Sequence, residues 1–154
     1  MIRIYTDGAA QGNPGPGGYG VILKYKDAVK ELSGGFRLTT NNRMELLAVI
    51  AGLEAITRPG IAINIYSDSK YVVDAIEKKW VWGWQAKNFK DKANKDLWIR
   101  YLPLHARYNP KYNWIRGHAG HPENERCDRL AVQAANSFNL LIDQEYEKQK
   151  SIEK

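Results

Sequence analysis

The sequence has a single cysteine, Cys127, so it cannot form an internal disulfide, and a reducing compartment suits it. It also lacks any apolar run approaching the roughly 18 residues needed to span a membrane. Residues 1–6 alternate as a strand does, and no charged segment with a long apolar stretch precedes them as in a secretory signal. We therefore expect a cytoplasmic protein without a membrane partner.

The charges do not balance, since 23 Lys and Arg residues face 17 Asp and Glu residues, giving a formal net charge of +6. A basic chain favours an anionic partner such as nucleic acid, although many soluble proteins are basic without one. At 154 residues and 44% hydrophobic content, the chain has the size of one domain and can bury a core.

The first forty residues indicate an antiparallel meander. Alternating β-branched and aromatic residues predict strands at 2–6, 19–25 and 29–38. Glycines and prolines crowd residues 7–18 and predict a tight loop there, and a short polar turn separates the second strand from the third. Both connections are too short for a crossover helix, so neighbouring strands should run antiparallel.

The rest of the chain has a different hydrophobic periodicity. Helical spacing of apolar residues ends at Arg58-Pro59-Gly60, and further helices are predicted at 69–79, 93–106 and 122–136. Short apolar runs at 61–66 and 112–115 predict two more strands. The expected fold is α/β: a mixed five-stranded sheet, three antiparallel strands then two parallel, with helices on both faces. We expect one domain over residues 1–136 and a charged, partly disordered extension over 137–154.

Four acidic residues occupy positions that a folded sheet could bring together. Asp7 and Asp68 follow the first and fourth strands, Glu45 opens a helix, and Asp128 lies in the last predicted helix. Sites in open α/β sheets gather at the carboxyl ends of strands. On a helical wheel, Glu45 lies about 70° from the centre of the apolar stripe, which turns it toward the sheet.

Each acid also has a purely structural interpretation. Asp7 could belong to a turn with Gly8, and Glu45 could form a capping box with the asparagine three residues earlier. Asp68 could cap the following helix, and Asp128 could pair with the neighbouring arginine. If the four converge, however, their repulsion requires a cation. Mg²⁺ takes such oxygen ligands, and two ions about 3.5–4 Å apart suit in-line phosphoryl transfer.

Several blocks of sequence closely resemble the type 1 ribonuclease H family, in particular its bacterial stand-alone members. The resemblance covers roughly residues 1–136 in collinear order. The blocks are Tyr5-Thr6-Asp7-Gly8-Ala9, Asn13-Pro14-Gly15, Thr39-Thr40-Asn41-Asn42-Arg43-Met44-Glu45, Ser67-Asp68-Ser69 and Arg116-Gly117-His118-Ala119-Gly120-His121-Pro122-Glu123-Asn124-Glu125-Arg126-Cys127-Asp128.

The resemblance implies a ribonuclease H-like fold and an endoribonuclease that hydrolyses the RNA strand of RNA–DNA hybrids. Asp7, Glu45, Asp68 and Asp128 match the family's metal-binding carboxylates. It implies two Mg²⁺ ions bound with substrate, with Mn²⁺ as a possible substitute. One ion would activate the attacking water and the other would stabilise the leaving 3′ oxygen, so products would carry 5′-phosphate and 3′-hydroxyl ends. His118 matches a flexible-loop histidine that helps to move protons or to release product, although it could also be an ordinary loop histidine. The family is expected to be monomeric.

Substrate recognition is implied for residues outside the carboxylate set. Asn13, Asn41 and Asn42 match positions that contact the hybrid across its minor groove. Asparagine can both donate to and accept from the RNA 2′-hydroxyl, although turn and cap roles compete. Thr40 matches the family's DNA-phosphate pocket, and Asn124 matches a residue near the metal site.

A Trp- and Lys-rich segment, residues 78–98, resembles the basic protrusion with which bacterial relatives grip the DNA strand. Trp80 and Trp84 match aromatic positions of that channel, and Trp98 is predicted to be core. Lysines beside aromatics also grip a nucleic-acid backbone without reading sequence. Leu38 and Gly83 stand where many relatives carry arginine and asparagine for the phosphate pocket. Arg37 could substitute for one of these, and Lys70 replaces a common glutamine.

Two other functions fit parts of the pattern. A nuclease of the same fold could act on another substrate, such as DNA junctions, but the asparagine cluster and the His118 loop argue against it. A non-catalytic hybrid-binding module would be expected to lack at least one of the four carboxylates, and all four are present.

Overall fold

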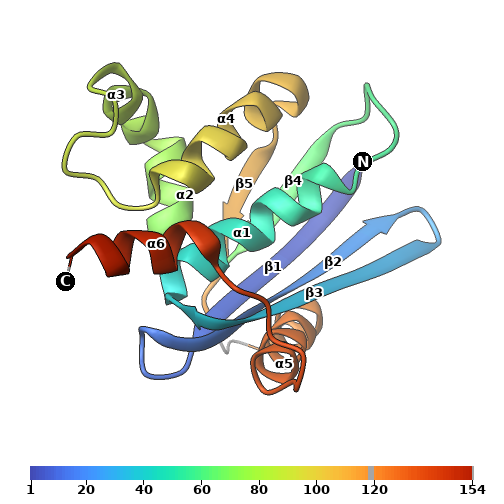
Figure 1. Ribbon diagram of the computed structural model, residues 1–154. Helices are drawn as coiled ribbons and strands as arrows, with labels where there is room; N and C mark the ends of the chain where they lie inside the picture. The colour runs from blue at the N-terminus through green and yellow to red at the C-terminus, as the bar shows by residue number, and fades with distance from the viewer. Residues whose placement is uncertain (118–119, 154) are drawn as a thin grey trace.

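A mixed sheet of five strands forms the centre of the computed structural model, which describes residues 1–117 and 120–153 (Figure 1). The strands are β1 (Ile2–Ala10), β2 (Gly15–Tyr25), β3 (Ala28–Thr39), β4 (Ile63–Ser67) and β5 (Lys111–Trp114). Their order is β3-β2-β1-β4-β5. The first three pair antiparallel, and β4 runs parallel to both β1 and β5. The predicted sheet is therefore confirmed.

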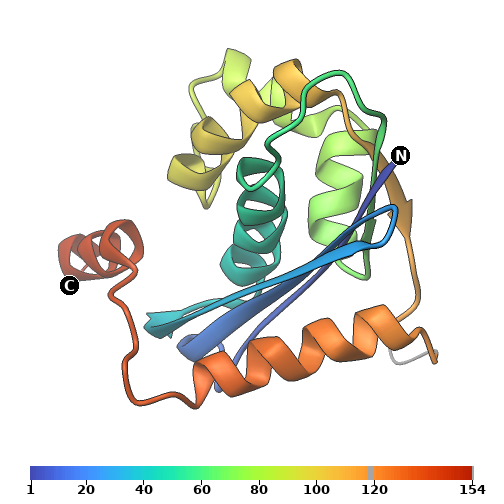
Figure 2. The ribbon, with the colours of Figure 1, turned by 90° about the vertical axis from the view of Figure 1, so that its right-hand side faces the viewer.

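Helices cover both faces of this sheet, as predicted. The described helices are α1 (Asn41–Glu54), α2 (Lys70–Glu77), α3 (Trp80–Ala86), α4 (Lys95–Tyr108), α5 (Pro122–Ala135) and α6 (Gln144–Glu153). Figure 2 shows α5 along one face and α1 and α2 on the opposite face. Among the residues that the structure describes, no helix is both long enough and apolar enough to cross a bilayer.

The main core lies between the sheet and α1. Ile4 and Ile65 of the sheet and Leu46 and Ile50 of α1 are completely buried. Trp98 of α4 is also completely buried, so its predicted core position is confirmed. Because α1 is covered by the sheet on one side and by α4 and α2 on others, its orientation is fixed. The side chains at its N-terminal end are therefore held in place relative to the sheet.

The glycine-rich segment is more regular than its composition predicted. β1 continues to Ala10 and β2 begins at Gly15, so the expected loop over residues 7–18 shrinks to residues 11–14. The glycines serve packing instead: a Cβ on Gly20 would lie 2.3 Å from the carbonyl oxygen of Cys127. The missing side chains let α5 lie directly on β2.

Helix α3 was not predicted. Its sequence, Trp-Val-Trp-Gly-Trp-Gln-Ala, has no helical repeat of apolar and polar residues, so the periodicity gave no signal. The residues that follow it leave regular structure, with left-handed backbone angles at Asn88, Phe89, Asp91 and Asn94. The Trp- and Lys-rich segment (residues 78–98, the basic protrusion) thus forms a short helix and a compact loop before it enters α4.

The C-terminal extension (residues 137–154) has definite structure where it is described. Leu141 forms an isolated parallel bridge with Phe36 of β3, Asp143 is buried, and α6 follows. The extension thus contributes a buried carboxylate to the rest of the molecule, and its predicted partial disorder stays a prediction. The domain boundary at residue 136 stays a prediction.

Candidate active site

Two carboxylates meet near the carboxyl end of β4 because β1 and β4 are parallel neighbours. Tyr5 is paired with Tyr66, Asp7 lies two residues beyond the first, and Asp68 lies two residues beyond the second. Equal offsets along parallel strands place both side chains at the same level of the sheet. Two acids with sixty residues of sequence between them are therefore neighbours in the fold.

Glu45 joins them because α1 crosses β1 at a glycine. A Cβ on Gly8 would lie 2.4 Å from the carbonyl carbon of Met44, so only glycine permits this approach. The Gly8 N–H then donates to both carboxylates, at 2.9 Å to Asp7 Oδ1 and 3.2 Å to Glu45 Oε1. The sequence predicts Gly8 only as a turn residue, because a backbone contact with a distant helix leaves no local pattern.

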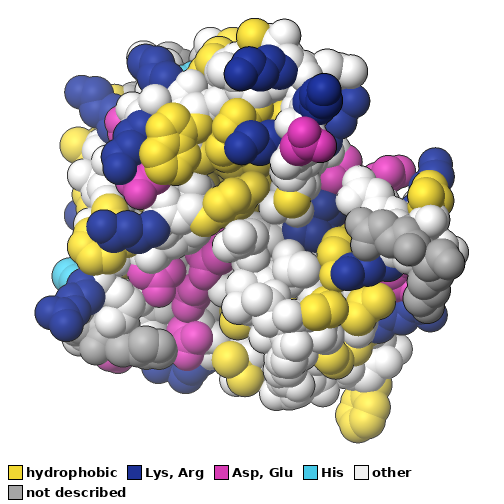
Figure 3. Space-filling model, turned by 90° about the vertical axis from the view of Figure 1, so that its left-hand side faces the viewer, with side chains coloured by type: hydrophobic (Ala, Val, Ile, Leu, Met, Phe, Trp, Pro, Cys, Tyr) yellow, Lys and Arg dark blue, Asp and Glu magenta, His cyan; other side chains and the backbone are white. Residues whose placement is uncertain are grey.

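Asp7, Glu45 and Asp68 each offer an oxygen, and these three oxygens lie within 4.8 Å of one another. They line an acidic cleft, together with Gly8, Ala9, Asn41, Asn42, Ser69, Lys70, Tyr71 and Asp128. Figure 3 shows acidic side chains gathered in a hollow of this face, below basic and hydrophobic ones. Half-buried Asp128 comes from α5 and completes the set of four acids in one cleft.

The structural interpretations of Glu45 and Asp68 are wrong. Thr40, not Asn42, caps α1, with its hydroxyl accepting from the Arg43 N–H at 3.2 Å. Ser69, not Asp68, caps α2 in the same way through the Val72 N–H. Neither acid is therefore used as the cap that its sequence position suggested.

The electrostatics of the cleft disfavour the ionised state of its two buried acids. Burial, with the charges of Asp68 and Asp128, raises the pKa of Asp7 to about 7. Burial and the charges of Asp7 and Asp68 raise the pKa of Glu45 well above its usual range. Among the described residues, Glu45 Oε2 is buried without a hydrogen-bond partner. An orphaned oxygen in an all-oxygen acidic cluster fits a hard divalent cation.

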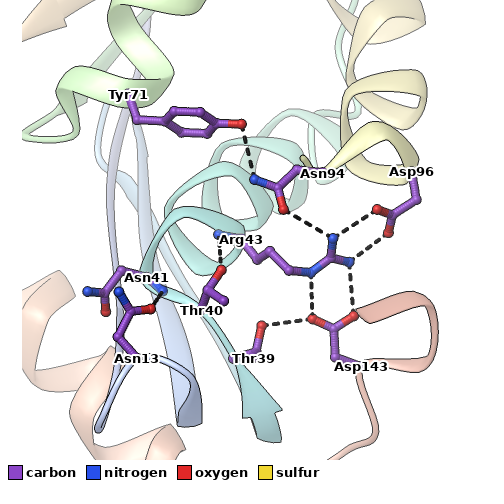
Figure 4. Close-up of polar contacts among 9 residues, drawn as sticks. All are labelled: Asn13, Thr39, Thr40, Asn41, Arg43, Tyr71, Asn94, Asp96 and Asp143. Carbon is purple, nitrogen blue, oxygen red and sulfur yellow. Dashed lines mark hydrogen bonds and ion pairs between the residues drawn. The ribbon is translucent and has the colours of Figure 1, made fainter. Parts of the chain in front are cut away.

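Two of the three asparagines predicted to contact the hybrid, Asn13 and Asn41, lie next to each other (Figure 4). Asn13 Oδ1 accepts from the Asn41 N–H at 2.9 Å, and Asn41 Oδ1 accepts from the Ala10 N–H at 2.6 Å. Asn41 and Asn42 are exposed and line the cleft. The structural role expected to compete for these residues is present in Asn13 and Asn41, and it fixes them at the N-terminus of α1.

The basic protrusion forms a second groove, separate from the acidic cleft. It is lined by Lys79, Trp80, Gly83, Trp84, Lys87, Lys90 and Lys92. Trp80 is 46% exposed. The ammonium groups of Lys78 and Lys92 lie 5.3 Å and 5.2 Å from the ring centres of Trp80 and Trp84. Lysines therefore cluster around aromatic rings at the surface.

The remaining predicted residues have varied positions. Asn124 of α5 is buried, and within the described structure its Nδ2 has no hydrogen-bond partner. His118 lies outside the described residues. Arg37 forms a bidentate pair with Glu147 of α6, so it is already engaged. Lys70 lines the cleft, with its ammonium 4.7 Å from the ring centre of Trp114.

The sheet order and the acids at its edge define an α/β protein of the ribonuclease H-like class. Residues 1–136 match the RNase H family. Proteins named Ribonuclease H from Desulforamulus reducens and Trichodesmium erythraeum are 59% and 54% identical to the chain, covering 92% and 95% of it and 92% and 96% of their own lengths. The chain belongs to the ribonuclease H family, as the resemblance implied, and the predicted enzyme class is confirmed.

Solved structures agree with this family assignment. LC9-RNase H1, described as a type 1 RNase H with the type 2 active-site motif, matches with a TM-score of 0.79 at 32% identity, over 96% of this chain and 79% of that one. LC11-RNase H1, solved in complex with an RNA/DNA hybrid, matches with a TM-score of 0.72 at 26% identity, over 88% and 97%.

Proposed function

We propose that this protein is an endoribonuclease that hydrolyses the RNA strand of RNA–DNA hybrids and leaves 5′-phosphate and 3′-hydroxyl ends. The observation that carries the proposal is the cluster of Asp7, Glu45 and Asp68, whose ligand oxygens lie within 4.8 Å beside exposed asparagines. Family membership supports it, as does the hybrid bound by LC11-RNase H1.

The residues that would hold the metal are Asp7, Glu45 and Asp68, with Asp128 adding charge from α5. Mg²⁺, as two ions when substrate is present, would supply charge stabilisation for the attacking and leaving oxygens, and Mn²⁺ is a possible substitute. The Gly8 N–H orients one oxygen of Asp7 and one of Glu45. This leaves Glu45 Oε2 unpartnered among the described atoms, and thus available as a ligand.

Substrate choice would rest on two surfaces. Asn41 and Asn42 line the acidic cleft, where amide groups can both donate to and accept from a 2′-hydroxyl that DNA lacks. The groove of the basic protrusion would hold the DNA strand through phosphate contacts and aromatic faces. His118 and Asn124 are proposed to assist proton movement and site geometry.

The first test is cleavage of an end-labelled RNA–DNA hybrid with Mg²⁺ by the native chain and by Asp7→Asn. We expect RNA cleavage only in the hybrid and only with metal, and a loss on the order of a thousandfold or more in Asp7→Asn. Asp27→Asn, in the exposed turn between β2 and β3, is the matched control and should cut normally.

Single-stranded RNA, duplex DNA and a branched DNA substrate complete the experiment. Hybrid binding without cleavage would instead identify a binding module, and cleavage of branched DNA would identify a different nuclease. Equal activity of Asp7→Asn and the native chain would overturn the carboxylate mechanism. We also propose that the protein acts as a cytoplasmic monomer, which light scattering and cell fractionation can test.

A further inference from the structure

Arg43, in the first turn of α1, is the centre of a buried ionic network (Figure 4). Its side chain is 2% exposed, and all five of its N–H donors are used. Asp96 of α4 accepts at 2.8 and 2.6 Å, and Asp143 of the C-terminal extension accepts at 2.8 and 2.9 Å. The fifth bond, to Asn94 Oδ1, is 3.4 Å long. Arg43 thus joins three segments that are distant in sequence.

Asp143 also holds the last residue of β3, two positions before α1 begins. Its Oδ2 accepts from the Thr39 hydroxyl at 2.7 Å, and Thr39 is completely buried at the end of β3. One carboxylate of the extension therefore contacts both sides of the junction between β3 and α1. Leu141 adds backbone hydrogen bonds to Gly35 and Arg37, so the extension is attached along the end of β3.

This junction carries the proposed substrate and metal groups. Asn41 and Asn42 begin α1, and Glu45 lies two residues after Arg43. Residues two positions apart on a helix are rotated by about 200° around its axis. Arg43 and Glu45 therefore point to different sides of the helix. On one side, Gly8 and Asn13 bind Glu45 and Asn41. On the other, Asp143 binds Arg43, so the first turn is held from two directions.

We propose that Asp143 is a positioning residue for the reaction, acting through Arg43 and Thr39 on the first turn of α1. The C-terminal extension, which lies beyond the matched residues 1–136, is then a functional part of the active site. The proposal rests on the proposed function for its kinetic consequence. Its structural consequence, the order of the first turn, can be measured independently.

The test compares the native chain with Asp143→Asn, which keeps the shape of the side chain but removes its charge. At 25 °C we expect a rise on the order of tenfold in the KM for hybrid and in the Mg²⁺ concentration for half-maximal rate, with kcat changing much less. Hydrogen exchange should also accelerate at the bonded amides of Ala10, Asn41 and Arg43, whether or not the protein cuts hybrids.

Two variants separate positioning from stability. Glu54→Gln removes the more exposed pair with Arg100 at the other end of α1 and should leave KM unchanged. Ile2→Ala cuts away a buried side chain at the far end of β1, and should lower Tm without raising KM. If Asp143→Asn does not fold, Thr39→Val removes one hydrogen bond to Asp143 and should produce the same changes, smaller in size.

An Asp143→Asn protein with lowered Tm but native KM, metal dependence and exchange at α1 would overturn the proposal. Accelerated exchange without any hybrid cleavage by the native chain would support the positioning and refute the proposed function. The two failures are therefore distinguishable.

Discussion

Helix α1 carries two buried charged clusters that are built in opposite ways. Around Arg43, one guanidinium is matched by two carboxylates, and every donor of the guanidinium is used. Around Glu45, three carboxylates (Asp7, Glu45 and Asp68, here called the acid-only cluster) offer oxygens within 4.8 Å of one another, and the Gly8 N–H donates to two of them. Burial disfavours the Arg43 charge, but the bonds to Asp96 and Asp143 outweigh it and raise the pKa of Arg43.

The comparison shows how a fold separates structural charge from functional charge. A buried ion that brings its own partners is satisfied once the chain has folded. A buried cluster of like charges is satisfied only by something from outside, either protons or a metal ion. The acid-only cluster is therefore expected to respond to pH and Mg²⁺, whereas the Arg43 cluster should respond to neither near neutral pH.

The largest expected effect comes from breaking the balanced cluster. Arg43→Met leaves Asp143 buried without its cation, so we expect the free energy of unfolding to fall by about 3–5 kcal/mol. Urea denaturation measures this. Arg100→Met is the matched control, because it breaks a more exposed bidentate pair with Glu54 and should cost only about 0–1 kcal/mol. Equal losses in the two variants would show that the buried network stabilises the fold no more than an exposed ion pair does.

A smaller effect is expected from pH on the acid-only cluster. The pKa of Asp7 is raised to about 7 in the folded chain, from 3.8 when unperturbed, so between these values the folded chain binds the proton more tightly. Without metal, protonation of Asp7 therefore stabilises the folded chain fully below about pH 4. This contribution to the free energy of unfolding, at most on the order of 4 kcal/mol, is lost as pH rises through 7. Denaturation in EDTA should show Asp7→Asn gaining stability over the native chain between pH 5 and pH 8.

Mg²⁺ should reverse this loss of stability with rising pH. Because the ligands bind as carboxylates, the apparent Mg²⁺ affinity should rise with pH up to about 7, with protons released on binding. Titration calorimetry in buffers of different ionisation enthalpy detects the protons. A pH-independent affinity with no proton release would contradict the raised pKa of Asp7.

The smallest expected effect is a gain in the stability of the metal-free protein. Glu45→Gln removes a buried charge whose pKa is raised by burial and by two neighbouring acids. We expect the metal-free protein to gain about 1 kcal/mol in stability, and Mg²⁺ to lose most of its effect on Tm. Thermal unfolding with and without Mg²⁺ tests both points. A destabilised Glu45→Gln would show that this carboxylate is a structural anchor rather than an unsatisfied ligand.

Local signals in the sequence predicted the elements well where a repeat was present. The alternation in β1 to β3 and the apolar spacing of α1 gave the sheet and its main helix. Elements without a repeat were missed: α3 has tryptophan on both sides, and glycines of β2 resembled a loop because the helix packed on them lies more than a hundred residues away. The extension looked like a charged tail because Asp143 finds Arg43 only in three dimensions.

The sequence by itself determined the family, the sheet, and which four acids to consider, because these depend on residue type and spacing along the chain. Only the tertiary structure decided that Asp7, Glu45 and Asp68 meet, and that Thr40 and Ser69 rather than Asn42 and Asp68 cap the helices. It also decided that Asp143 binds Arg43 and Thr39. The physical reason is that convergence depends on strand pairing, and on the backbone contact between Gly8 and Met44. Neither the pairing nor that contact leaves a local pattern.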